Sequence, residues 1–248
     1  MKTPFGRTGG KSRIKKEIVL LFPKDFKIYV EPFVGAGSVF FGKEKKNHLE
    51  ILNDKDENPI NLIKLFKETD GNEISKNINN IYIKEDFQKL LNDKTNTNKY
   101  RDLLLNKLSF RCNLRSFSIG RRLKPGDNNN IIKSKYDNRY KERLKDVILL
   151  NKDYKDIIDK YDSPDTFFYL DPPYEGAKKD YIFGEINPLD VFNIVDNIKG
   201  KFLLSYNKSE NILKIFNKFN IKTINTTYSN NVGGGLKKEE LLIYNYVL

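Results

Sequence analysis

The stretch KIYVEPFVGAG (Lys27–Gly37) combines a β-rich run with a turn that contains two glycines. A second short β-rich run, LEILND (Leu49–Asp54), follows it, and the next segment, ENPINLIKLFKE, has the apolar spacing of a helix. We expect a further helix to open at VFFGKEK, between the two runs. This order of strand, turn, helix and strand is typical of the start of a parallel sheet.

Further strand candidates lie in the second half of the chain. They read VILLN, TFFYL, KFLLSY, IKTINTTYS and ELLIYNYVL, and helical patterns such as DYKDIIDKY and PLDVFNIVDNI separate several of them. The last two candidates have a glycine-containing connection and no helix between them, which favours an antiparallel hairpin. We therefore predict an α/β sheet of about seven strands that ends in such a hairpin.

The pattern changes between residues 60 and 146. Helical segments such as EDFQKLLND and KYRDLLLNKLSF alternate there with polar runs such as KTNTNK and KPGDNNN. We predict that residues 60–146 form an inserted, mostly helical domain, and that residues 1–59 and 147–248 together form the sheet domain.

The composition limits the chemistry that is open to the chain. Lysine and arginine number 45 against 33 acidic residues, a net charge of +12, which suggests a nucleic-acid partner, although solubility or a lysine-biased genome would also account for it. One cysteine, Cys112, and one histidine, His48, exclude an internal disulfide and a zinc site built from these residues, and we expect no metal. We expect His48 at the surface, without a role. No apolar run is long enough to span a membrane, so we expect a cytoplasmic protein.

The glycine turn after the first strand suits a ligand that approaches the main chain. Gly35 and Gly37 permit a sharp bend, but Phe40 stands where the dinucleotide fingerprint requires glycine or alanine. Asp54 ends the second strand, at a position where a carboxylate typically accepts hydrogen bonds from ribose hydroxyls. A tight turn and a helix-capping aspartate are the simpler alternatives. Together, the two features favour a ligand that contains a nucleoside.

The tetrapeptide DPPY follows the strand candidate TFFYL. Asp171 should therefore lie at the carboxyl edge of the sheet, where open α/β folds bind ligands. Pro172 and Pro173 have a fixed φ and no N–H, and Tyr174 adds a flat ring. A carboxylate and a carbonyl suit the exocyclic amine of a nucleobase, and the ring suits a base that has left its stack. The alternative is a proline-terminated strand with a capping aspartate.

These motifs, taken in order, resemble those of the Dam-like (D12 class) DNA adenine-N6 methyltransferases, which use S-adenosylmethionine. The resemblance covers most of the chain and includes FGRTGGK (Phe5–Lys11), EPFVGAGSVF, LNDKDENPINLI, DPPY, LLSYN and YSNNVGGGLKKEELLIYNY. It implies a Rossmann-like methyltransferase sheet that binds S-adenosyl-L-methionine. It also implies that the helical insertion is the target-recognition domain.

The resemblance also implies which residues bind the cofactor. Phe33, Gly35 and Gly37 would line its methionine end, and the segment NKDY would lie near its adenine. Arg7 stands where the family often has tryptophan or tyrosine, and a guanidinium plane can also stack. The predicted cofactor-binding residues are Arg7, Lys11, Phe33, Gly35, Gly37, Asp54, Asp153 and Asp171.

The catalytic residues implied by the resemblance are Asp171, Pro172, Pro173 and Tyr174. We interpret Asp171 and the Pro172 carbonyl as acceptors for the two amino hydrogens of a flipped adenine, which would concentrate the lone pair on N6. Tyr174 would stack on the base. Methylation of cytosine N4 or of an RNA adenine, and a DNA-binding module with a decayed cofactor site, remain as alternatives.

The segment NKLSFRCNLRSFSIGRRLK in the insertion mixes basic and aromatic side chains. Its charges suit phosphates, and arginine can also read guanine edges, whereas a solvated helix end is the alternative. We expect Phe110 and Phe117 in a local core. We expect double-stranded DNA as the partner of a monomeric protein, wherever that DNA lies. The predicted DNA-binding residues are Arg111, Asn113, Arg115, Arg121, Arg122 and Lys124.

Overall fold

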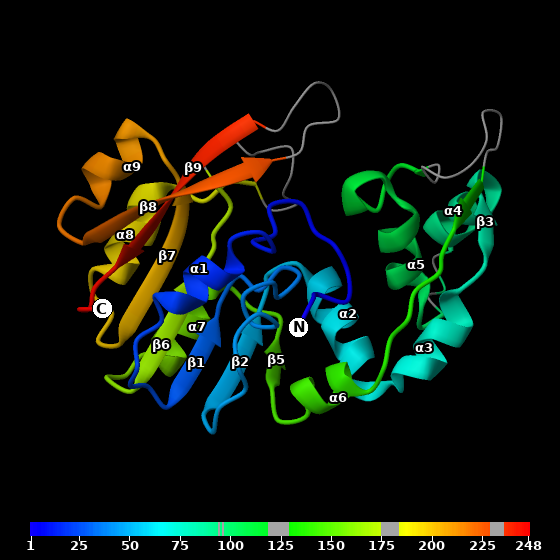
Figure 1. Ribbon diagram of the computed structural model, residues 1–248, viewed down its shortest axis with the longest axis horizontal. Helices are drawn as coiled ribbons and strands as arrows, with labels where there is room; N and C mark the ends of the chain where they lie inside the picture. Colours follow the sequence, from blue (N-terminus) through cyan, green and yellow to red (C-terminus); the bar gives the residue numbers. More distant parts are fainter. Residues whose placement is uncertain (94, 96, 119–128, 175–183, 229–235) are drawn as a thin grey trace.

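The computed structural model describes residues 1–93, 95, 97–118, 129–174, 184–228 and 236–248. Its main element is a seven-stranded sheet with the order β5-β2-β1-β6-β7-β9-β8 (Figure 1). The strands are β1 (Ile28–Glu31), β2 (Leu49–Asn53), β5 (Ile148–Leu150), β6 (Thr166–Leu170), β7 (Lys201–Asn207), β8 (Asn220–Tyr228) and β9 (Leu236–Tyr244).

The strand directions agree with the sequence-based expectation. β5, β2, β1, β6 and β7 are parallel to one another, whereas β9 is antiparallel to both β7 and β8. All seven strand candidates are strands of this sheet, and the terminal pair is the antiparallel hairpin. The predicted α/β, Rossmann-like fold is therefore confirmed.

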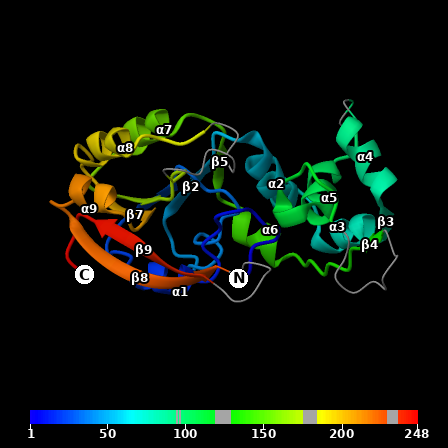
Figure 2. The ribbon, with the colours of Figure 1, turned by 90° about the horizontal axis from the view of Figure 1, so that it is seen from above.

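Helices cover both faces of the sheet. Helices α7 (Tyr154–Tyr161), α8 (Pro188–Val195) and α9 (Glu210–Ile215) lie on one face, and α1 (Lys15–Leu20) lies on the other (Figure 2). Successive side chains of β6 point to opposite faces and enter different cores: Phe168 and Leu170 pack with the first set of helices, while Phe167 and Tyr169 pack with α1. Burial on both faces explains why this strand reads as a continuous apolar run.

The helix expected at VFFGKEK does not form, because the connection from β1 to β2 is a series of turns. Two helix-like hydrogen bonds form in this connection. The Phe41 N–H donates to the Gly37 carbonyl at 2.8 Å, and the Lys43 N–H donates to the Val39 carbonyl at 2.9 Å. Phe40 and Phe41 are both buried, and the Lys43 ammonium pairs with Glu50 of β2. The chain therefore turns back towards the sheet instead of continuing a helix.

His48 lies in the same connection and is not a surface residue, contrary to expectation. Its side chain is 5% exposed and packs on the Phe26 ring, with ring centroids 4.7 Å apart. Burial and the nearby Lys43 ammonium lower the pKa of His48 to about 4. The imidazole is therefore neutral at physiological pH and belongs to the packing of this loop.

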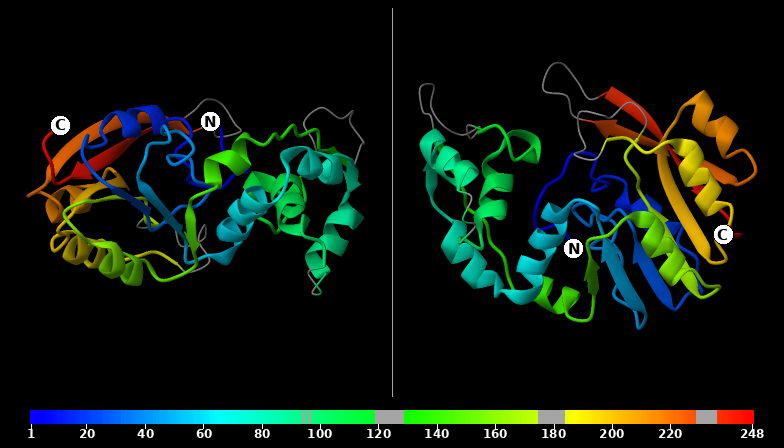
Figure 3. Two further views of the ribbon diagram at one scale, coloured as in Figure 1. Left: turned by 90° about the horizontal axis from the view of Figure 1, so that it is seen from below. Right: turned by 180° about the vertical axis from the view of Figure 1, so that it is seen from behind.

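The segment between β2 and β5 projects to one side of the sheet (Figures 1 and 3). It is mostly helical, as expected, but it also contains a two-stranded antiparallel sheet that the sequence did not predict. Apolar residues of α2 and α5 share one hydrophobic cluster with the α1 face of the main sheet. The elements are α2 (Glu57–Glu68), α3 (Gly71–Ile78), β3 (Ile81–Ile83), α4 (Lys84–Asn92), α5 (Arg101–Leu108), η1 (Phe110–Cys112), β4 (Asn129–Ile131) and α6 (Arg139–Leu144).

Candidate active site

The glycine turn and the end of β2 are joined by Asp54. One Asp54 oxygen accepts the Gly35 N–H at 2.9 Å, and the other accepts the Asp56 N–H at 2.9 Å. Burial raises the pKa of Asp54, although the Arg7 guanidinium opposes this effect. Gly35 and Gly37 have φ values of +50° and +67°, which explains why glycine is needed at both positions. A Cβ at Gly37 would lie 3.2 Å from the Phe41 ring, so the absence of a side chain at Gly37 allows this ring to pack against the turn.

Asp171 follows β6 at the carboxyl edge of the sheet, as expected. The Ser205 hydroxyl donates to its Oδ1 at 2.9 Å, and the Lys11 ammonium lies 2.7 Å from the same oxygen. The Tyr174 hydroxyl also donates to Oδ1, at 3.3 Å. Within the described part of the chain, no residue donates a hydrogen bond to Oδ2.

Tyr174 lies in a cluster of aromatic and charged side chains. Its ring stacks on Tyr206, with centroids 5.3 Å apart and planes 22° apart, and the Lys11 ammonium lies 4.7 Å from its centroid. Its hydroxyl reaches Oε2 of Glu240 at 3.3 Å. Burial and the carboxylates of Asp171 and Glu240 raise the pKa of Tyr174 well above its usual value, so the phenol remains a hydrogen-bond donor.

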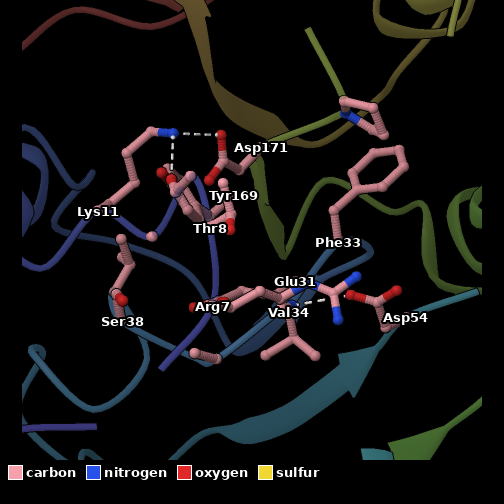
Figure 4. Close-up of a pocket in the computed structure, with 16 residues that line it drawn as sticks. Arg7, Thr8, Lys11, Glu31, Phe33, Val34, Ser38, Asp54, Tyr169 and Asp171 are labelled. Carbon is pink, nitrogen blue, oxygen red and sulfur yellow. Dashed lines mark hydrogen bonds and ion pairs between the residues drawn. The ribbon is translucent and has the colours of Figure 1, made fainter. Parts of the chain in front are cut away.

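A cavity of about 70 Å³ lies between the glycine turn and the DPPY loop. Figure 4 shows Lys11 pointing to Asp171 at one end of this cavity, and Arg7 reaching towards Asp54 at the other. Its lining residues are Arg7, Thr8, Gly9, Gly10, Lys11, Glu31, Phe33, Val34, Gly35, Ala36, Ser38, Val39, Asp54, Tyr169, Asp171 and Pro173.

A second cavity, of about 100 Å³, adjoins the first. Both cavities are lined by Arg7, Phe33, Asp54 and Pro173, so they form one cleft along the carboxyl edge of the sheet. The second cavity is more apolar in character, with Pro32, Tyr154 and Ile186 among its lining residues. Asp153 also lines it, where it caps α7 by accepting the Lys155 N–H at 3.1 Å and pairs with Lys55 at 2.9 Å.

Glu31 is a cavity residue that the sequence analysis missed. It ends β1, is 1% exposed, and accepts a hydrogen bond from the Tyr29 hydroxyl at 2.5 Å. Burial raises the pKa of Glu31 to about 8, although the Tyr29 hydrogen bond and the Lys43 charge oppose this effect. Glu31 is the last residue of its strand, one position earlier than Asp54 and Asp171, which come directly after theirs.

Arg7 and Lys11 lie in the cleft as expected, but both are already paired with acidic side chains. The Arg7 guanidinium donates to Asp56 at 3.0 Å, and its Cδ would lie 3.3 Å from a Cβ at Gly35. Lys11 is held at Asp171, with its side chain 3% exposed. Pro172 is buried between the cavity residues Asp171 and Pro173.

The predicted DNA-binding residues are only partly described. Arg111 and Arg115 are exposed near the end of α5, while the Asn113 carboxamide accepts the Arg115 and Ser116 N–H groups and so builds a turn. Arg121, Arg122 and Lys124 lie outside the described residues. Phe110 is 44% exposed, so the prediction that it lies in a local core is wrong. Its ring contacts the Arg111 guanidinium instead. Phe117 packs on Phe87, with centroids 5.8 Å apart, as expected.

The described residues hold no group of three or more histidine, cysteine, aspartate or glutamate side chains placed to bind a metal ion. Within the same residues, no helix is both long and apolar enough to cross a bilayer.

The family of the chain is shown by a family model, and two relatives are similar to it along nearly their whole length. A family model described as D12 class N6 adenine-specific DNA methyltransferase matches residues 8–230, a range that holds the glycine turn, Asp54 and Asp171. Type II methyltransferase M.MjaIII of Methanocaldococcus jannaschii is 27% identical over 96% of this chain and 96% of its own length. Type II methyltransferase M.CviBI of Paramecium bursaria Chlorella virus NC1A is 26% identical over 96% of this chain and 97% of its own length.

Proposed function

The chain belongs to the D12 class of N6 adenine-specific DNA methyltransferases, and from this premise we propose that it uses S-adenosylmethionine and a flipped adenine in duplex DNA. The family makes adenine N6 in DNA the target, in place of cytosine N4 or an RNA adenine. The observation that carries the proposal is the continuous cleft in which Gly35, Asp54 and Asp171 meet at the carboxyl edge of the sheet.

The residues along the cleft suit the methionine, ribose and adenine parts of S-adenosylmethionine in turn. Asp54 borders both cavities, and its carboxylate suits the ribose hydroxyls. The second cavity has the more apolar surface and suits the adenine ring, with Tyr154 beside it. Phe33 borders both cavities, so it would contact the adenine as well as the methionine end at which the sequence placed it. Glu31, in the first cavity, suits the ammonium of the methionine part. Arg7 borders both cavities and would pack beside the ribose, and Asp153 would lie near the adenine.

The bound cofactor supplies a methyl group on a positively charged sulfur. Asp171 Oδ2 and the Pro172 carbonyl would accept the two hydrogens of the adenine amine, which concentrates the nitrogen lone pair and aims it at the methyl carbon. Orientation and fixed charges then provide most of the rate enhancement. Methyl transfer makes the amine cationic, and the proton it then loses is acidic enough to leave without a strong base.

The target adenine has to leave the duplex stack, because the Asp171 carboxylate lies inside the cleft. Tyr206 already stacks on the Tyr174 ring and holds it in place. We propose that the adenine packs against this ring pair, with Pro173 beside it. The aromatic support would replace part of the stacking energy that the base loses when it leaves the duplex.

We propose that residues 60–146 form the target-recognition domain and that residues 1–59 and 147–248 form the catalytic domain of a monomer. Arg111 and Arg115 are exposed and suit DNA phosphates, and we assign the same role to Arg121, Arg122 and Lys124. Asn113 would orient this segment through its turn hydrogen bonds. The enzyme would work in the cytoplasm or in whichever compartment holds its DNA.

Calorimetric titration with S-adenosylmethionine tests the cofactor site. Asp54→Asn should weaken binding at least about tenfold, because it removes a charged acceptor and disturbs the Gly35 contact. Asp165→Asn is the matched control: Asp165 forms an exposed ion pair with Lys27, before the amino end of β6. Equal affinity of wild type and Asp54→Asn would refute the proposed cofactor placement.

A further inference from the structure

An N-terminal strap, residues Pro4–Lys11, runs between the helical insertion and the main sheet (Figure 1). Its residues Arg7 and Lys11 line the proposed cofactor cleft. At its first residue, the Tyr136 hydroxyl donates to the Pro4 carbonyl at 2.8 Å. At its last, Lys11 pairs with Asp171. The strap therefore contacts both halves of the molecule within eight consecutive residues.

Asn106 of α5 binds the middle of this strap. Its Oδ1 accepts the Gly6 N–H at 3.2 Å, and its Nδ2 donates to the Gly6 carbonyl at 2.9 Å. Asn106 is 4% exposed and lies between the buried Leu105 and Leu108, so its carboxamide has little freedom to move. Both main-chain polar groups of Gly6 are thus held by one rigid side chain of the insertion.

The residue after Gly6 is Arg7, which borders both cavities of the cleft. Consecutive Cα atoms are about 3.8 Å apart, so fixing Gly6 limits where Arg7 can lie. The other end of the strap is fixed at Asp171. A displacement of Gly6 would therefore move the side chains that border the proposed cofactor site.

The strap also contacts the segment that carries the DNA-binding candidates. The Thr8 hydroxyl donates to the Arg111 carbonyl at 3.3 Å, and a Cβ placed on Gly6 would lie 2.5 Å from Cys112 Sγ. Arg111, Cys112 and Leu114 have φ values of +51°, +58° and +60°. L-residues disfavour this left-handed conformation, so the contacts around the segment have to maintain it.

We propose that Asn106 is a positioning residue that holds the strap in the cofactor cleft, and that it couples DNA contact at Arg111–Leu114 to the affinity for S-adenosylmethionine. This inference rests on the proposed function of the cleft. DNA phosphates bound by Arg111 would act on the strap through Thr8 and Gly6. Because coupling between two ligands is reciprocal, the cofactor should change the affinity for DNA by the same factor.

Calorimetry with S-adenosylmethionine, with and without DNA, tests the coupling. In wild type we expect the two ligands to change each other's affinity. Asn106→Ala should weaken cofactor binding about tenfold and remove most of this mutual effect, and it should raise KM more than it lowers kcat.

Asn138→Ala is the matched control. Asn138 also accepts a glycine N–H, that of Gly71 at 3.1 Å, and donates to Asp70 at 2.6 Å, but both contacts lie within the insertion. It should lower the melting temperature without changing cofactor affinity. An equal effect of the two substitutions on cofactor affinity would overturn the proposal.

A second pair of variants keeps the proposal testable if Asn106→Ala does not fold. Gly6→Ala should weaken cofactor binding, because its methyl group meets Cys112 Sγ. Cys112→Ala leaves only Cβ, which would lie 3.7 Å away, so the double variant should regain affinity. Normal binding by Gly6→Ala, or no recovery in the double variant, would contradict the inference. Failure of wild type to bind S-adenosylmethionine would instead refute the proposed function.

Discussion

Glu31→Gln gives the most quantitative prediction. Glu31 is a buried carboxyl group at the end of β1, and its pKa is raised from 4.5 to about 8. Glutamine has nearly the same shape and can still accept the Tyr29 hydrogen bond, but it does not titrate. The substitution therefore isolates the contribution of this one proton.

The sign follows from the direction of the pKa change. A folded-state pKa above the unfolded value means that the native protein binds more protons between pH 4.5 and about 8. Wild type should therefore lose stability as the pH rises through this interval. The cost is about 1.4 kcal/mol per pH unit, or about 5 kcal/mol over the whole interval. Glu31→Gln lacks this loss, so its free energy of unfolding relative to wild type should increase with pH by up to that amount.

Urea denaturation of both proteins at a series of pH values between 4.5 and 8 measures this difference. The same proteins can be titrated with S-adenosylmethionine over that range. If the cofactor ammonium pairs with Glu31, binding ionises the carboxyl group, and wild-type affinity should rise towards pH 8, by up to about tenfold per unit. The Gln variant should show no such rise. Parallel pH profiles of stability for the two proteins would refute the reasoning.

Three further substitutions test other contacts of the site. Gly35→Ala should destabilise the fold by about 1–2 kcal/mol in thermal denaturation, because φ is +50° and the new Cβ would lie 3.3 Å from Arg7 Cδ; an unchanged melting temperature would contradict this. Arg111→Asn should stabilise the fold by about 1 kcal/mol, since asparagine tolerates φ of +51° better, while weakening DNA binding and its salt dependence; unchanged DNA affinity would argue against the phosphate contact. Lys11→Met should cost about 3–5 kcal/mol in urea denaturation, because Asp171 and Glu240 lose their shared cation; a loss below about 1 kcal/mol would show that the pair is not needed for stability.

The sequence was sufficient for the main sheet and for the family. Runs such as TFFYL are mostly apolar because β6 is buried on both faces, and this pattern is readable without tertiary information. The family inferred from the ordered motifs is confirmed by the match over residues 8–230. The three-residue strands β3 and β4 were missed because each is too short to show a period.

The expected helix at VFFGKEK failed for a tertiary reason. Phe40 and Phe41 are both buried in the core, and Lys43 forms an ion pair with Glu50. These contacts outweigh the local preference of the segment, which is a weak guide when packing opposes it. The terminal helix α1 was also missed, because its six residues, KKEIVL, contain little periodic signal.

The site was predictable where it depends on strand ends. Asp54 and Asp171 follow strands in the sequence and therefore reach the same edge of the sheet. Glu31 lies at the same edge because it is the last residue of β1, but the stretch EPFVGAG was interpreted for its glycine turn alone. The pairing of Lys11 with Asp171 and Glu240 could not be predicted, because it joins three segments that lie far apart in the sequence.

Methyl transfer from isotopically labelled S-adenosylmethionine to DNA is the most direct test of the central claim, that Asp171 holds the amine of an adenine for methylation. The DNA is digested after reaction and its nucleosides are identified by mass spectrometry. Wild type should place the label on adenine N6. Asp171→Ala removes the partner of the buried Lys11 ammonium and should lose stability, so it is assayed at a temperature at which circular dichroism shows it folded, and there its rate should fall by at least about 10²-fold. Label on cytosine N4, or near-normal turnover by a folded Asp171→Ala, would contradict the account.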